Sequence, residues 1–327
     1  MLNLQNSRIL VTGGAGFIGS FIVEQLLNEE VKEIVVIDNF FRGSRENLDT
    51  CLQDHRVVLV EGDIRDQIFV DAQLKGIDYC FHLAALRITH CADKPREALE
   101  VMYGGTFNVL ESCVHHKVKK VLFASSASIY GQAEIFPTPE RHHPYHNQTL
   151  YGAAKLANEL MLRSFYYMHD LSYNAVRYFN VYGPRMDTDG KYTEVFIRWY
   201  HLIKGGKPPL IFGKGDQTMD FIYVEDAARA SVLALKADID NEVFNVASGV
   251  ETSLEELCYL LLETMESSLK PQYIPLPENR KKIEVKRRLA DVSKAKEKIG
   301  FQRTVDLKKG LKKLVQWLKA REKLITT

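Results

Sequence analysis

The sequence predicts an α/β protein built on a doubly wound parallel sheet. Short runs of β-branched residues alternate with helical segments through the first half of the chain. The expected strands are apolar along almost their whole length, which is typical of strands buried on both faces. A glycine-rich turn joins the first expected strand to the first expected helix, as in other doubly wound folds.

The expected elements follow one another at short intervals. The sequence predicts strands at residues 8–12, 34–37, 57–60, 79–83 and 121–125, with helices at 17–28 and 95–116 between them. Proline and glycine residues interrupt the second half of the chain at short intervals. Helices are expected there at 195–203, 224–236, 254–265 and 307–319. We therefore expect a first domain at residues 1–180 and a smaller α/β substrate domain at 181–327, with interleaved segments.

Composition excludes several classes of protein. The 327 residues are 46% hydrophobic, which is enough to form a core. The 43 basic and 42 acidic side chains nearly balance, so the net charge gives no bias toward nucleic acid or membranes. We find no signal-peptide pattern and no apolar run of about 18 residues. The five cysteines are scattered, so we expect a cytoplasmic protein with reduced thiols. His142 and His143 have no evident third ligand in sequence, and we expect no metal site.

The glycine turn predicts a phosphate-binding site. Gly13, Gly16 and Gly19 form a G-x-x-G-x-x-G pattern directly after the first strand. Glycines allow a tight turn and let a pyrophosphate approach the amides at a helix N-terminus. Asp38 ends the second strand, where an acid binds an adenosine ribose and disfavours a 2′-phosphate. This favours NAD over NADP, although Arg42 and Arg45 could instead pair with such a phosphate.

A second motif predicts proton transfer. Tyr151 and Lys155 are four residues apart and share one face of an expected helix. A lysine ammonium beside a phenol is expected to lower the phenol pKa, so that the phenolate can remove a proton from a sugar hydroxyl. Ser125 and Ser126 end the fifth strand, where a hydroxyl can bind the same substrate oxygen.

Taken in order, these motifs resemble the extended short-chain dehydrogenase/reductase proteins of the nucleotide-sugar epimerase/dehydratase family. The resemblance runs through TGGAGFIG at 12–19, SSASIYG at 125–131, RYFNVYGP at 177–184 and FGKGDQTMDFIYVED at 212–226. It implies a Rossmann-type domain, NAD held through each turnover, a UDP-linked sugar substrate and a homodimer. It also implies Tyr151 as the base, Lys155 as its partner and Ser126 as the hydroxyl facing the substrate.

The resemblance also implies the residues of the two binding sites. The expected cofactor residues are Gly13, Gly16, Phe17, Ile18, Gly19, Asp38, Asn39, Arg42, Gly43, Ser44, Asp63, Ile64, Leu83, Ala84, Ala85, Arg87, Ala124, Ser125, Tyr151, Lys155, Tyr178, Asn180 and Val181. The expected substrate residues are Ser126, Ala127, Ser128, Tyr151, Asn180, Arg280, Arg287 and Arg288.

Two departures from the family bear on the reaction and its substrate. Dehydratases of the family usually carry Asp-Glu just after this strand end, and decarboxylases a Glu, where this chain has Ala127 and Ser128. The absence of these acidic residues favours 4-epimerisation through a 4-keto sugar over dehydration or another reaction of the 4-keto intermediate. The remote alternative is a non-enzymatic regulator that binds NAD. Met219 replaces the family's diphosphate-binding arginine. Binding of the diphosphate would then depend on Arg280, Arg287 or Arg288, unless these arginines are surface residues of a loop without a binding role.

Overall fold

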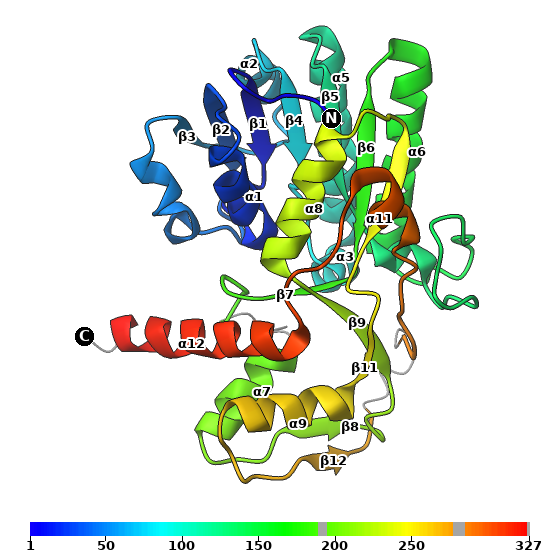
Figure 1. The fold of residues 1–327 in the computed structure, drawn as a ribbon. Helices are drawn as coiled ribbons and strands as arrows, with labels where there is room; N and C mark the ends of the chain where they lie inside the picture. Colours follow the sequence, from blue (N-terminus) through cyan, green and yellow to red (C-terminus); the bar gives the residue numbers. More distant parts are fainter. Residues whose placement is uncertain (189–194, 277–284, 326–327) are drawn as a thin grey trace.

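The computed structural model describes residues 1–188, 195–276 and 285–325. Figure 1 shows two lobes, with a large sheet above and a smaller group of helices and strands below. Within these residues, no helix combines the length and the apolar character needed to cross a membrane.

The upper lobe is built on one parallel sheet of seven strands. Its order is β10-β6-β5-β4-β1-β2-β3, and every neighbouring pair is parallel. The strands are β1 Arg8–Thr12, β2 Glu33–Asp38, β3 Val57–Glu61, β4 Tyr79–His82, β5 Lys120–Ser126, β6 Tyr173–Tyr178 and β10 Glu242–Val246. This arrangement confirms the predicted doubly wound α/β fold.

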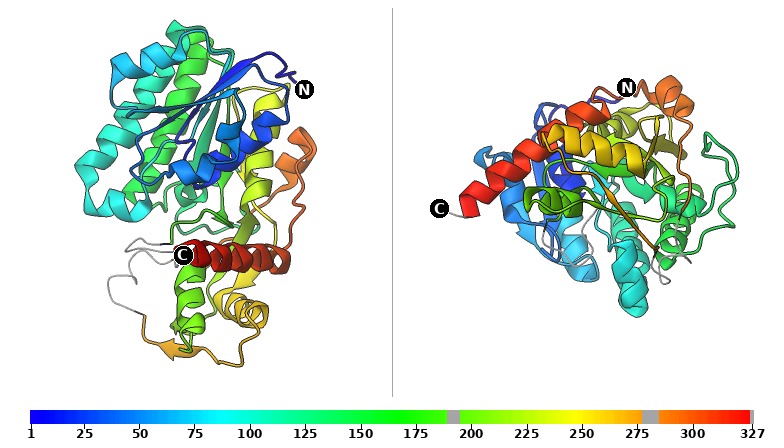
Figure 2. Two further views of the ribbon diagram at one scale, coloured as in Figure 1. Left: turned by 90° about the vertical axis from the view of Figure 1, so that its left-hand side faces the viewer. Right: turned by 90° about the horizontal axis from the view of Figure 1, so that it is seen from below.

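Helices cover both faces of the sheet because its strands alternate apolar residues between two cores. In β1, Ile9 and Val11 pack with the helices α1 (Phe17–Leu27) and α8 (Val224–Lys236). Leu10 points to the opposite face. The helices there are α2 (Gln67–Leu74), α5 (Thr106–His115) and α6 (Leu150–His169). The left view of Figure 2 shows the two groups of helices on either side of the sheet.

The single helix expected at 95–116 is broken in the structure. It forms α4 (Pro95–Leu99), a π-helical turn at Glu100–Gly105 and then α5, while α3 (Ile88–Asp93) precedes them. Gly105 lies against Ile64, whose Cδ1 would be 2.6 Å from any Cβ at that position. Turns of this type are frequent at functional sites. Short 3₁₀ helices lie at Arg45–Leu48, Cys51–Gln53 and Ala127–Tyr130.

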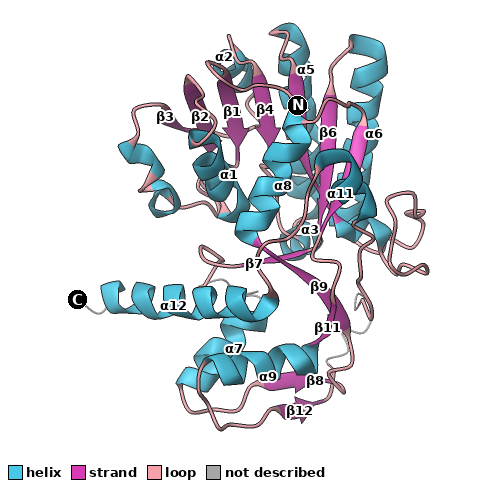
Figure 3. Cartoon of the chain, viewed as in Figure 1, coloured by secondary structure: helices cyan, strands magenta, loops and turns pink. Residues whose placement is uncertain are grey.

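The lower lobe has its own core. One sheet has the order β11-β9-β7, made of Glu251–Ser253, Thr218–Tyr223 and Asn180–Tyr182, and β12 (Gln272–Ile274) pairs with β8 (Leu210–Phe212). Figure 3 shows these strands beside α7 (Val195–Lys204), α9 (Leu254–Thr264) and α12 (Leu307–Ile325). The Lys-rich α12 buries Leu311, Leu314 and Leu318, as an amphipathic helix does.

Segments that follow residue 180 also belong to the upper lobe. Strand β10 pairs with β6, and α8 packs on α1 and over β5 and β6. Helix α11 (Ser293–Ile299) contacts α8 and β10. At the junction of the lobes, the fully buried Asp220 carboxylate accepts hydrogen bonds from the Ser248 amide at 2.8 Å, the Gly249 amide at 3.0 Å and the Ala290 amide at 3.3 Å. These bonds fix the lower lobe against the end of β10.

Candidate active site

A cavity of about 590 Å³ lies at the carboxyl ends of the central strands, and both lobes line it. Ligands of doubly wound folds bind at this edge, where the strand order reverses. All the cofactor residues predicted from the sequence, except Asn180, line this cavity. Asn180 lies on β7, where its side-chain amide donates to the Asp220 carbonyl at 3.0 Å.

The glycine turn is shaped by close backbone contacts. Gly13 has a φ of 68°, and a Cβ there would lie 2.8 Å from the Ala84 amide nitrogen. A Cβ at Gly19 would collide with the Gly13 carbonyl oxygen. Helix α1 begins here with no side-chain cap and no acidic residue in its first turn. Its first amides are therefore available to an anion, as a pyrophosphate requires.

Asp38 lies beside this turn at the end of β2. Its carboxylate accepts hydrogen bonds from the Ala15 amide at 3.0 Å and the Phe40 amide at 2.9 Å. Burial raises the pKa of Asp38, and these two hydrogen bonds oppose that rise. Gly43 approaches so closely that a Cβ there would lie 2.7 Å from Asp38 Oδ1. An acid held next to the phosphate-binding turn fits the adenosine ribose of NAD.

Ser126, Tyr151 and Lys155 meet on the cavity wall between β5 and α6. The Ser126 hydroxyl lies close enough to the Tyr151 phenol to lower its pKa. Lys155 is buried, donates from Nζ to the Ala124 carbonyl at 2.5 Å and lies 5.9 Å from the centre of the Tyr151 ring. Thr149 caps α6 by accepting the Gly152 amide at 3.1 Å, which fixes the first turn of the helix, where Tyr151 lies.

The pKa of Tyr151 is raised in this structure, opposite to the predicted lowering. Burial raises the pKa of Tyr151, and the Ser126 hydroxyl lowers it by less. Burial also lowers the pKa of Lys155 to about 8. Sequence spacing places the pair on one helix face but gives no measure of the desolvation that both groups suffer. The charges that lower the pKa of Tyr151 come instead from Arg42 and Arg288.

A buried chain of hydrogen bonds supports the cavity wall at residues 83–85. Thr12 Oγ1 accepts the Leu83 and Ala84 amides at 3.2 and 3.3 Å and lies 2.7 Å from His82 Nδ1. His82 Nε2 lies 3.0 Å from Thr106 Oγ1, which donates to the Met102 carbonyl at 2.8 Å. Burial lowers the pKa of His82 to about 3, so the ring is neutral. This chain positions the loop at residues 83–85.

A second buried network lies behind Ser125. The Ser125 hydroxyl donates to Glu159. Arg177 donates to both Glu159 oxygens, from Nε at 2.9 Å and from Nη2 at 2.6 Å. Arg177 Nη1 also donates to the Tyr130 hydroxyl at 2.8 Å and to the Glu140 carbonyl at 2.7 Å. The hydroxyl at the end of β5 is therefore tied to an ion pair in the protein interior.

The predicted substrate residues do not all reach the cavity. Ser126 and Ser128 line it, whereas Ala127 is buried beside it. Arg288 lies close enough to Tyr151 to lower its pKa. Arg287 instead forms a bidentate pair with Glu251, at 2.7 and 2.9 Å. Arg280 lies outside the described residues.

The structure adds cavity residues that the sequence analysis missed. Asp187 pairs with the predicted cofactor residue Arg87 at 2.7 Å, and Arg42 lies 4.0 Å from the same carboxylate. Arg185 lines the cavity and stacks on Phe21, with its guanidinium carbon 4.3 Å from the ring centre. Arg185 and Asp187 follow the RYFNVYGP motif directly, which was the available signal. Arg321, which comes from α12, had no such signal.

The histidines singled out in the sequence take no part in the cavity wall. His142 is buried, and neither His142 nor His143 lines the cavity. Met219 lies on β9, partly buried against the core of the lower lobe, in place of a phosphate-binding side chain.

Comparison with known proteins places this site in a family. The model of the family described as NAD dependent epimerase/dehydratase matches residues 9–247. The chain belongs to the NAD-dependent epimerase/dehydratase family. It is therefore an NAD-dependent enzyme, and its relatives are UDP-sugar epimerases, decarboxylases and related dehydratases.

Relatives of this family member carry out different reactions. The chain is 32% identical over 320 residues to a UDP-glucose 4-epimerase of Mycolicibacterium smegmatis, covering 95% of this chain and 98% of the relative. It is also 32% identical over 324 residues to a UDP-N-acetyl-α-D-glucosaminuronate decarboxylase of Bacillus cytotoxicus, with the same coverage. Among solved structures, the chain resembles UDP-N-acetylglucosamine 4-epimerase from Methanobrevibacter ruminantium, which was solved in complex with UDP-N-acetylmuramic acid. The two superpose with a TM-score of 0.90 at 32% identity, and the match covers 97% of this chain and 99% of that one.

Proposed function

We propose that this enzyme is a 4-epimerase of a UDP-hexose or a UDP-N-acetylhexosamine. The observation that carries the proposal is the composition of the wall beside Tyr151. Ser126 lines the cavity beside Tyr151 and lowers its pKa, and the next two residues are the buried Ala127 and the hydroxyl-bearing Ser128. This stretch offers the hydroxyls of Ser126 and Ser128 to a sugar oxygen, without the carboxylate pair that elimination of water would need there.

In this proposal Tyr151 exchanges a proton with the C4 hydroxyl of the sugar, which Ser126 orients. NAD, when bound, supplies reversible hydride transfer at C4. Tyr151 must lose its proton in a site where burial raises its pKa, so neighbouring positive charge is needed. Arg42 and Arg288 provide that charge near the phenol.

The sugar would then turn over within the site before it is reduced again on its other face. Loss of the C4 hydroxyl proton and of the C4 hydride gives a 4-keto sugar. Return of the hydride to the opposite face of C4, with return of the proton to the C4 oxygen, gives the C4 epimer with no net oxidation. Met219 stands where the family usually has an arginine that binds the diphosphate. Arg288 is therefore our candidate for binding the substrate diphosphate. Burial lowers the pKa of Arg288 to about 10, and the group still carries its charge near neutral pH.

A decarboxylase is the second candidate, because a decarboxylase is as similar in sequence as an epimerase. The test is incubation of the purified protein with UDP-glucose, UDP-N-acetylglucosamine and UDP-glucuronic acid, without added reductant, followed by chromatography of the products. A C4 epimer of one sugar supports the proposal. Release of CO₂ with a UDP-pentose, or accumulation of a 4-keto-6-deoxy sugar, would assign decarboxylation or dehydration instead. Absence of both product and cofactor reduction would favour a non-enzymatic NAD-binding role.

We also propose a homodimer formed through the helices on one face of the sheet. Large apolar side chains are exposed on this face: Leu99 on α4, Phe107 on α5, and Leu160 and Tyr167 on α6, with exposed fractions of 41–64%. Exposed apolar groups on neighbouring helices are typical of an interface. Light scattering should give twice the chain mass for the native protein and the monomer mass for Leu160→Glu. A native monomer would contradict this arrangement.

A further inference from the structure

The loop between β5 and α6 carries a group of side chains that the proposed reaction does not use. It projects beyond α6 at the right of Figure 1, away from the edge strand β3. Glu134, His143 and His146 bring one carboxylate oxygen and two ring nitrogens together, all within 4.8 Å of one another. The sequence had shown two neighbouring histidines without a third ligand, and folding of the loop supplies Glu134 and His146.

The distances in this group suit metal ligands better than hydrogen bonds. His143 Nε2 lies 3.3 Å from Glu134 Oε2, and His146 Nδ1 lies 3.5 Å from Glu134 Oε1. A good N–H···O hydrogen bond measures about 2.9 Å. In a tetrahedral zinc site with bonds of about 2.0–2.2 Å, neighbouring ligand atoms are about 3.3–3.5 Å apart. Small movements of exposed side chains would therefore complete the coordination.

A buried histidine holds two of the three candidate ligands in place. His142 Nε2 accepts the Glu134 amide at 3.0 Å, which makes Nδ1 the protonated nitrogen. Nδ1 then donates to the His143 carbonyl at 2.7 Å. One neutral ring thus connects the backbone of Glu134 to that of His143. Ligands fixed in this way lose less conformational entropy when a metal binds.

We propose that Glu134, His143 and His146 bind a divalent transition metal, with zinc as the best match to one carboxylate and two imidazoles. Binding replaces the contact between His146 Nδ1 and the Gln132 carbonyl, now 3.2 Å long. The metal would join the start of the loop to its end, three residues before the α6 cap Thr149. It would thereby stabilise the segment that leads into Tyr151, without touching the cavity.

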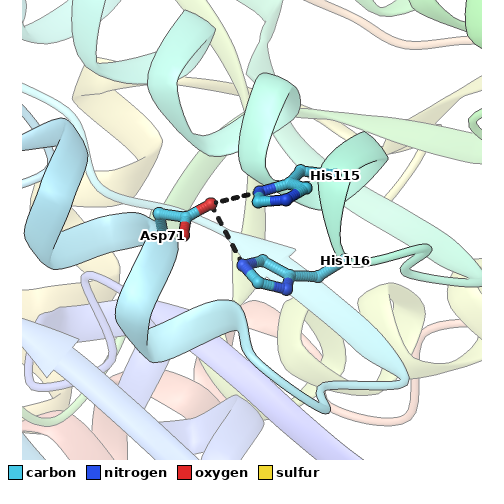
Figure 4. Close-up of side chains that lie close together, drawn as sticks. All are labelled: Asp71, His115 and His116. Carbon is cyan, nitrogen blue, oxygen red and sulfur yellow. Dashed lines mark hydrogen bonds and ion pairs between the residues drawn. The ribbon is translucent and has the colours of Figure 1, made fainter.

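A second histidine group provides the contrast and the control. In Figure 4, His115 and His116, at the end of α5, both point to one oxygen of Asp71 on α2. His115 Nδ1 forms a hydrogen bond of 2.8 Å with Asp71 Oδ1, and His116 Nε2 lies 3.0 Å from the same oxygen without forming a hydrogen bond. Both distances are shorter than the spacing between neighbouring ligands of a tetrahedral zinc ion. This group is therefore explained as a link between two helices, and it is not included in the proposal.

The test compares two double variants of the full-length protein, His143→Ala/His146→Ala and His115→Ala/His116→Ala. Each is stripped with a chelator and titrated with Zn²⁺ by calorimetry and with Co²⁺ by visible absorption, which reports the coordination geometry. We expect one saturable site in the native protein and in the His115/His116 variant. The His143/His146 variant should lose at least about tenfold in affinity, together with the Co²⁺ spectrum.

Thermal unfolding distinguishes a loss of metal binding from a loss of folding. Both variants should unfold cooperatively without metal, and Zn²⁺ should raise the Tm of the native protein and of the His115/His116 variant alone. If the His143/His146 variant does not fold, Glu134→Gln, an exposed substitution, takes its place in the same titrations. The proposal is wrong if no saturable site appears, if the loop variant binds Zn²⁺ as the native protein does, or if the His115/His116 variant is the one that loses binding.

Discussion

Replacing Arg177 by methionine should destabilise the protein strongly, because it leaves a charge alone in the interior. The side chains of Arg177 and Glu159 are only 9% and 7% exposed, and two hydrogen bonds of 2.9 and 2.6 Å join them. The substitution also removes the donors to Tyr130 and to the Glu140 carbonyl. Breaking one side of a buried pair costs about 3–5 kcal/mol. We expect a loss of that size in the free energy of unfolding.

A double-mutant cycle separates the buried charge from the lost packing. Glu159→Met alone should cost a similar amount, because it leaves the Arg177 guanidinium unpaired. The double variant carries neither charge and should be no less stable than either single variant, which gives a coupling energy of about 3 kcal/mol or more. Urea unfolding at neutral pH, analysed with the slope m held in common, measures all four proteins.

A surface pair serves as the control for this cycle. Lys308 and Glu263 are 2.7 Å apart but 50% and 59% exposed, so Lys308→Met should change the unfolding free energy by less than about 1 kcal/mol. A loss below about 1 kcal/mol for Arg177→Met, or a double variant whose loss equals the sum of the singles, would refute the assignment of the cost to an orphaned charge.

Three further substitutions test the active site. Tyr151→Phe should lower kcat by about 10²–10⁴-fold while NAD stays bound, since it removes the proton-transferring hydroxyl; near-native turnover would exclude this assignment. Gly19→Ala should weaken NAD binding, because the new Cβ collides with the Gly13 carbonyl; cofactor titration by fluorescence checks it, and native affinity would be the contrary result. Burial lowers the pKa of Lys155 from 10.5 to about 8, so below pH 8 the folded protein holds a disfavoured ammonium. Lys155→Met should therefore raise the unfolding free energy at pH 7 by up to about 3 kcal/mol. The gain should shrink as the pH rises from 8 toward 10.5, and a gain independent of pH would argue against this origin.

Features that depend on local pattern could be predicted from the sequence. The strands of the upper sheet are short apolar runs, and Gly13 and Gly19 occupy positions where the backbone leaves no room for a side chain. The spacing of Tyr151 and Lys155 places both on one face of α6, as a regular helix requires.

Features that depend on distant residues could not be predicted in this way. Nothing near Arg287 in the sequence indicates that Glu251 will pair with it, 36 residues away. The direction of the Tyr151 pKa follows from burial by several elements, which one helix does not reveal. Likewise, His143 and His146 gain Glu134 through the path of a loop that has no periodic pattern.

The late position of β10 in the chain has a consequence for biosynthesis. Six strands of the upper sheet lie before residue 180, but the edge of β6 is completed by residues 242–246. A nascent chain that has emerged only to residue 180 therefore presents the unpaired backbone of Tyr173–Tyr178, and α1 lacks its neighbour α8. Open sheet edges of this kind pair readily with other chains. During synthesis, the sheet of the upper lobe can therefore be completed only after much of the lower lobe has been made.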